Sequence, residues 1–149
     1  MTHFVVRTDI AAAPERVWQV MSDIERWPTW TASIASVRLN SAMSPGMGSG
    51  VRIRQPLLFP ATWIIIAWEP GRGFDWVSHS MGVRAVTSHA IAAAPGGSTV
   101  TLTLTFEGVL ARPAGFLGGP LTRYYMQTEA NGLKAASERA SRLADLSPR

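Results

Sequence analysis

The chain has 149 residues, of which 46% are hydrophobic and 16% charged, and it contains no cysteine. This composition is typical of a globular protein that buries a hydrophobic core, and it excludes disorder, disulfides and thiolate chemistry. The net charge of +4 comes from scattered basic residues, and all but one of the 14 are arginine. With no basic cluster in the sequence, we expect no nucleic-acid partner.

Membrane and export signals are also missing from the sequence. The longest apolar run, Ala61 to Trp68, is far too short to span a bilayer, and the first ten residues lack the pattern of a signal peptide. We therefore expect a cytoplasmic protein with no integral membrane segment, folded as a single domain over residues 1–149. Its oligomeric state, monomer or homodimer, stays open.

The N-terminal part predicts one strand and two short helices. Residues 4–10 are β-branched and apolar, as in a strand. Pro14 stands where a helix begins, and apolar residues then recur at helical spacing up to Ile24. Asp23 is expected to cap a second short helix that Pro28 soon ends.

From about residue 33 to residue 108, short β-type runs alternate with turn sequences. The runs are SIASVRLN, VRIRQ, ATWIIIAWE, FDWVSHS, VRAVTSHAIAA and TVTLTLTFEG. The separators EPGRG, SMG and APGGS have the length and the Gly and Pro content of hairpin loops. Together with residues 4–10, these runs predict a seven-stranded antiparallel sheet.

A long helix is predicted from Pro120 to about Leu143. At 100° per residue its apolar stripe consists of Leu121, Tyr125, Met126, Gly132, Leu133, Ala136, Ala140 and Leu143. Glu129 falls within this stripe, where a carboxylate is costly to bury unless it is paired, hydrogen-bonded or next to water. Tyr125, one turn earlier, is its expected partner. The small residues Gly132 and Ala136 indicate space around it.

The apolar segment before this helix, residues 108–119, has two readings. It is either a packed hydrophobic loop or a lid whose Phe116 and Leu117 cover a pocket mouth.

Strand alternation predicts which side chains face the helix. It places His89 inward and His79 outward. The tryptophans of DIERWPTW, Trp27 and Trp30, are expected to close one end of a cavity between sheet and helix.

Four segments carry a resemblance to a known group of proteins. They are APERVWQVMSDIERWPTW, PATWIIIAWEPGRGFDWVS, GVRAVTSHAIAAAPGGSTVTLTLTFEG and LTRYYMQTEANGLKAASE. The chain resembles the helix-grip (SRPBCC, START-like) superfamily, and within it the bacterial polyketide cyclase/dehydrase-like family. This resemblance agrees with an α+β fold in which a curved seven-stranded antiparallel sheet wraps a long C-terminal helix, with two short helices after the first strand. Members include ligand carriers, enzymes and interaction modules.

The first functional hypothesis is binding of a small hydrophobic or aromatic molecule, lipid- or polyketide-like, as in lipid transport. Its expected contacts are Trp30, Gln55, Trp63, Phe74, Trp76, His89, Phe106, Tyr125 and Glu129. No cofactor is expected. No metal is expected either, because His79 and Asp75 on one strand face supply only half a site.

Two alternatives remain open. A polyketide cyclase or dehydratase needs a base beside a carbonyl and an acid for the departing hydroxyl, and His89, Glu129 and Tyr125 are the candidates. His89 and Glu129 can equally be structural residues satisfied by their neighbours. A protein–protein interaction module would instead use the outer face, where Arg52, Arg54 and Arg84 could form a basic patch.

Overall fold

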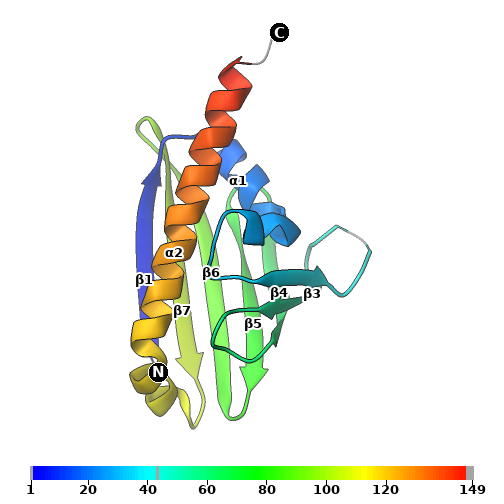
Figure 1. Ribbon diagram of the computed structural model, residues 1–149, viewed down its shortest axis with the longest axis vertical. Helices are drawn as coiled ribbons and strands as arrows, with labels where there is room; N and C mark the ends of the chain where they lie inside the picture. Colours follow the sequence, from blue (N-terminus) through cyan, green and yellow to red (C-terminus); the bar gives the residue numbers. More distant parts are fainter. Residues whose placement is uncertain (1, 43, 147–149) are drawn as a thin grey trace.

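The computed structural model describes residues 2–42 and 44–146. A seven-stranded antiparallel sheet, in the order β1-β7-β6-β5-β4-β3-β2, carries one long helix across its face (Figure 1). The elements are β1 (Thr2–Ile10), α1 (Pro14–Ser22), the 3-10 helix η1 (Ile24–Thr29), β2 (Ser36–Leu39), β3 (Gly50–Arg54), β4 (Ala61–Glu69), β5 (Gly73–Ser80), β6 (Val83–Ala94), β7 (Gly97–Glu107) and α2 (Ala111–Leu146). The predicted helix-grip architecture is confirmed.

The sheet curls around α2 because its two halves run in different directions. In Figure 1, β3 and β4 cross the direction of β6 and β7. The pairing of β4 with β5 shifts between Ile65 and Ala67, and a bulge of this kind bends a strand. The run WIIIAW lacks alternation in sequence because Ile64 and Ile66 are apolar although they are 40% and 39% exposed.

The short helices differ from the prediction in one detail. Asp23 occupies the position before η1, but its side chain makes no capping hydrogen bond. The helix is fixed instead by Trp27, which is 1% exposed and whose indole Nε1 donates to the Met21 carbonyl at 2.9 Å. The Trp27 ring lies 5.4–6.0 Å from the rings of Trp30, Phe74, Trp76 and His89.

The long helix begins at Ala111 rather than Pro120, so the loop expected over residues 108–119 is wrong from Ala111 onward. Tertiary contacts with β1 hold these first turns, since the Thr2 hydroxyl donates to the Ala111 carbonyl at 3.3 Å. A Cβ on Gly115 would lie 2.4 Å from the Thr2 side chain. Phe116, which would cover the pocket mouth in the lid reading and pack inward in the loop reading, is 84% exposed.

The buried face of α2 follows the predicted stripe only in its middle. Met126, Ala130, Leu133 and Ser137 are buried, whereas Leu143 is 60% exposed. Figure 1 gives the reason, since the last turns of α2 project beyond the sheet.

The sequence suggested that Gly132 leaves space around Glu129, but the structure gives a different reason for a glycine at this position. A Cβ built at this position would lie 2.1 Å from the Trp30 carbonyl oxygen and 3.0 Å from the Trp30 ring. Glycine is therefore required by the close approach of α2 to the end of η1.

This contact predicts a contrast between two glycines of one helix. Gly132→Ala should lower the free energy of unfolding by about 1–3 kcal/mol, because the backbone of Trp30 must move. Gly118→Ala is the matched control: its Cβ would meet nothing closer than 4.0 Å, so it should stabilise the helix by about 0.5–1 kcal/mol. Urea unfolding measures both, and equal effects would contradict the close approach.

Candidate functional site

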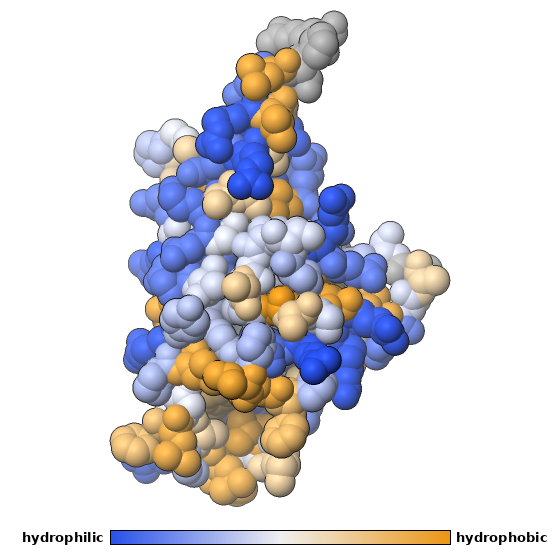
Figure 2. All heavy atoms as spheres, in the orientation of Figure 1, coloured by the Kyte–Doolittle hydropathy of each residue, from blue (hydrophilic) through white to orange (hydrophobic). Residues whose placement is uncertain are grey.

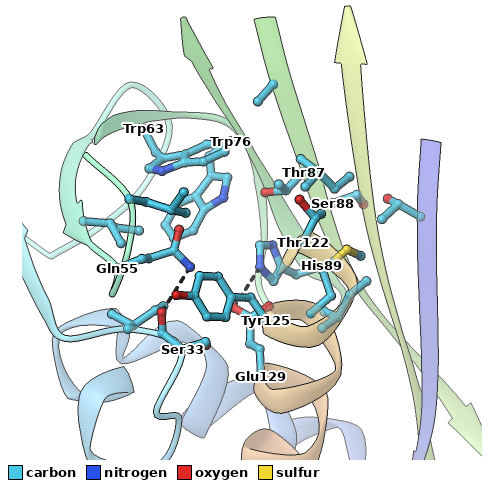
Figure 3. Close-up of a pocket in the computed structure, with 18 of the residues that line it drawn as sticks. Ser33, Gln55, Trp63, Trp76, Thr87, Ser88, His89, Thr122, Tyr125 and Glu129 are labelled. Atoms are coloured by element: carbon cyan, nitrogen blue, oxygen red, sulfur yellow. Dashed lines mark hydrogen bonds and ion pairs between the residues drawn. The ribbon is translucent and has the colours of Figure 1, made fainter. Parts of the chain in front are cut away.

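A pocket of about 180 Å³ lies between the sheet and α2 (Figure 3). Its apolar wall comes from Ile34, Ile53, Leu58, Trp63, Trp76, Ala85, Leu102, Leu104, Phe106 and Met126. Its polar lining comes from Ser33, Gln55, Thr87, Ser88, His89, Thr103, Thr122, Tyr125 and Glu129. The pocket is thus a largely apolar space into which a few polar groups point.

Two tryptophans from neighbouring strands form the aromatic side of the pocket. The rings of Trp63 and Trp76 lie 5.6 Å apart and are tilted by 33°. Phe74 and Trp27 support Trp76 from behind, at 5.1 and 5.5 Å. The wall is held by aromatic packing over several layers, which limits its freedom to collapse into the pocket.

His89 points inward from β6, as alternation predicted, and is 4% exposed, whereas His79 is exposed on the outer side. Its ring stacks on Phe74 at 4.4 Å with an interplanar angle of 11°. Nδ1 of His89 is buried and finds no hydrogen-bond partner within the described residues. The ring is thus fixed in orientation with one nitrogen unsatisfied.

Glu129 on α2 faces this histidine. Its Oε1 lies 3.7 Å from Nε2 of His89, and the two side chains are 16% and 5% exposed. The separation is within ion-pair range but longer than a hydrogen bond. The carboxylate in the apolar stripe therefore has a partner from the sheet, and the pair brings two proton-exchanging groups to one wall.

Tyr125 is not the partner of Glu129 that the sequence suggested. Its hydroxyl donates to the Pro56 carbonyl, which ties α2 to the β3–β4 loop across the pocket. Gln55 from the same loop donates from Nε2 to the Ser33 carbonyl at 3.2 Å (Figure 3). By contrast, the buried Thr87 hydroxyl has no hydrogen-bond partner within the described residues.

The structure brings most of the expected contact residues together. Those that line the pocket are Gln55, Trp63, Trp76, His89, Phe106, Tyr125 and Glu129. Phe74 lies behind the His89 ring, and Trp30 packs on Trp27 at 5.4 Å and against Gly132. These two residues support the site without lining it, because η1 covers their end of the sheet.

Sequence reasoning did not select Thr87 and Thr122, two further polar residues of the wall. The sequence spacing of each could have indicated its place in the pocket wall. Thr87 is two residues before His89 on the same strand face, and Thr122 is seven residues before Glu129 on the same helix face.

The outer-face arginines do not gather into a patch. Arg84 pairs with Glu107 at 2.7 Å, and Arg52 donates to the Thr62 hydroxyl at 3.2 Å. The strand order separates β3 from β6 by two strands, which is about 14 Å. Within residues 2–42 and 44–146, no three His, Asp or Glu side chains are grouped as metal ligands would be.

Comparison with known proteins decides the family. Residues 1–139 match the family described as polyketide cyclase / dehydrase and lipid transport. The chain belongs to this family. Uncharacterized proteins of Mycobacterium tuberculosis and Mycobacterium bovis are 31% identical to it over 120 residues, covering 76% of this chain and 71% of theirs.

Solved structures share the fold at lower identity. Ara h 8.0201 superimposes with a TM-score of 0.73 at 14% identity, covering 91% of this chain and 97% of that one. A Thermus thermophilus protein gives 0.68 at 21% identity, with 98% and 100% covered. The di-domain ARO/CYC BexL of the BE-7585A biosynthetic pathway gives 0.70 at 15% identity, with 94% of this chain and 50% of that one. Among the helices described here, none is long and apolar enough to cross a membrane.

The His89–Glu129 pair predicts energetic coupling in the free protein. In a double-mutant cycle with His89→Gln and Glu129→Gln, the coupling free energy should be about 0.5–3 kcal/mol, because the groups lie 3.7 Å apart and are largely buried. The more exposed pair Lys134–Glu138, an i,i+4 contact at 3.2 Å, should give only about 0.3–0.5 kcal/mol. Urea unfolding of the four proteins in each cycle measures this, and a His89–Glu129 coupling near zero would show that the two groups act independently.

Proposed function

We propose that this protein binds a small, mainly apolar aromatic molecule in the pocket between the sheet and α2. The observation that supports this most is the combination of a rigid aromatic wall, Trp63 and Trp76, with two buried polar atoms, the Thr87 hydroxyl and His89 Nδ1, that find no hydrogen-bond partner among the described residues. Ligand sites have this character: they are apolar surfaces with a few convergent polar groups that fix orientation.

The pocket volume sets the expected size of the ligand. An apolar cavity of about 150 Å³ is large enough to bind benzene. At about 180 Å³, this pocket suits a molecule of one or two rings. A longer polycyclic or acyl ligand would have to extend through the mouth or displace side chains.

The unsatisfied polar atoms indicate which functional groups the ligand should carry. Burial without a hydrogen bond is unfavourable for the Thr87 hydroxyl and for the free nitrogen of His89. A ligand with one hydroxyl or carbonyl on an aromatic body would gain from satisfying Thr87 or the Glu129 carboxylate while its ring contacts Trp63. 2-Naphthol is a probe of this class.

Blocking the pocket should abolish binding and leave the fold intact. Ala85 lines the pocket from β6, so Ala85→Phe should weaken 2-naphthol binding at least tenfold by filling the space. The matched control on the outer face of the same strand is Ala92→Phe, which should bind as the unaltered protein does. Tryptophan fluorescence quenching measures both, and unchanged affinity in Ala85→Phe would place the ligand elsewhere.

A second candidate function is proton-transfer catalysis of the cyclase or dehydratase kind. The observation that favours it is the 3.7 Å approach of His89 to Glu129 at the pocket wall. One member of such a pair can take a proton from a carbon next to a carbonyl while the other stabilises the charge that results. The family description includes cyclase and dehydrase activity as well as lipid transport.

Deuterium exchange tests this without knowledge of the natural substrate. If Glu129 is the base, the protein in D2O should accelerate exchange at the carbon next to the carbonyl of 2-tetralone, and Glu129→Gln should lower that rate by about 10²-fold or more. Glu138→Gln, on the same helix but outside the pocket lining, is the control. If 2-tetralone binds but its deuterium exchange is no faster than in buffer alone, the protein is a carrier and does not catalyse this proton transfer.

A further inference from the structure

Large apolar side chains are exposed at one end of the molecule, where α2 begins. They are Leu57, Phe59, Met81, Val109, Phe116 and Leu117, each between 79% and 95% exposed, and we call them the apolar rim. Antiparallel register places the β3–β4 loop, the β5–β6 turn and the β7–α2 connection at this same end. Figure 2 shows apolar surface gathered at the lower end of the visible face, below a band of hydrophilic residues.

The backbone marks two of these positions as unusual. Leu57 (φ 67°) and Met81 (φ 40°) are the non-glycine residues with positive φ in the described chain. Bulky L-residues disfavour this region, and a two-residue turn with positive φ at both centres, as at Met81 and Gly82, favours Asn at the first. Neither core packing nor turn chemistry accounts for exposed apolar side chains here, which indicates an interaction outside the chain.

Hydrogen bonds join the segments of the rim to one another. The Leu110 amide donates to the Gly82 carbonyl at 3.2 Å, which connects the β5–β6 turn with the β7–α2 connection. The Tyr125 hydroxyl donates to the Pro56 carbonyl, which connects α2 with the β3–β4 loop. The rim is therefore one surface built from separate parts of the chain.

The pocket opens toward this surface. Its deep members, Trp76 and His89, are buried, whereas Leu58, which precedes Phe59 in the β3–β4 loop, is 47% exposed. Phe106, at the end of β7, and Thr122, in the first half of α2, are also partly exposed. A partner bound to the rim would thus face the pocket mouth.

The charges around the rim are basic. Within residues 54–60, 80–84 and 107–123, the charged side chains are Arg54, Arg84, Glu107, Arg112 and Arg123. Glu107 is already paired with Arg84 at 2.7 Å. Two copies meeting through this surface would bring arginines against arginines, whereas anionic headgroups would complement them.

We propose that this end of the protein docks on an anionic lipid surface. The rim side chains enter the interface, Arg112 and Arg123 contact headgroups, and the pocket mouth faces the membrane. A ligand could then pass between bilayer and pocket without crossing bulk water. Docking itself does not require the ligand.

Co-sedimentation with vesicles tests the proposal. The protein should bind phosphatidylcholine vesicles that contain phosphatidylglycerol, bind pure phosphatidylcholine far more weakly, and be released by high salt. The double variant Phe59→Ser with Phe116→Ser should bind about tenfold or more weakly, because two apolar side chains stay in water. Arg112→Glu should bind about fivefold or more weakly.

Matched controls lie at the far end of α2. Leu146 is 80% exposed and Arg142 is also exposed, so Leu146→Ser and Arg142→Glu should bind vesicles like the unaltered protein. Ala85→Phe should also dock normally, which separates failure of docking from failure of pocket binding. No binding to the anionic vesicles, or equal losses in rim and control variants, would overturn the proposal. Sedimentation velocity showing a dimer that only the rim variants dissociate would assign the surface to a second copy instead.

Discussion

The close approach of α2 to Trp30 at Gly132 is the constraint on which the pocket depends. With 2.1 Å between a hypothetical Cβ and the Trp30 oxygen, the helix can approach η1 only because this residue has no side chain. Nearer its start the same helix presents Thr122, Tyr125 and Glu129 to the pocket. One end of the sheet–helix layer is therefore packed closely, and the other keeps an apolar space with polar groups in its wall.

Within that space, aromatic packing determines where the polar groups stand. Phe74 holds the His89 ring from behind, and Trp27 packs beside it, so the imidazole cannot turn to seek other partners. Its ion-pair partner among the described residues is Glu129, which α2 carries to the same wall of the pocket. A fixed, partly unsatisfied pair in an apolar site is suited to orienting a polar ligand group or exchanging a proton with it.

The strands and their faces could be predicted because their signals are local. Alternation placed His89 inward and His79 outward, and β4 begins and ends at the predicted residues, Ala61 and Glu69. The start of α2 could not be predicted from local sequence. Gly119 and Pro120 usually mark a helix boundary, but contacts with Thr2 stabilise the helical turns that precede them. The partner of Glu129, His89, is distant in sequence, and Phe74 lies behind the pocket wall because η1 packs over it. Neither feature could be predicted without the tertiary structure.

The pocket as a binding site for a small aromatic molecule is the central claim, and an NMR titration with 2-naphthol tests it most directly. The indole N–H signals of Trp63 and Trp76 and the amide signals of Thr87 and His89 should shift together and saturate, because these residues surround the pocket. The indole signal of Trp18, which packs on Trp68 at 4.9 Å outside the pocket, should stay in place. Shifts that do not saturate, or that fall on outer-face residues such as Ala90 and Ala92, would contradict the account.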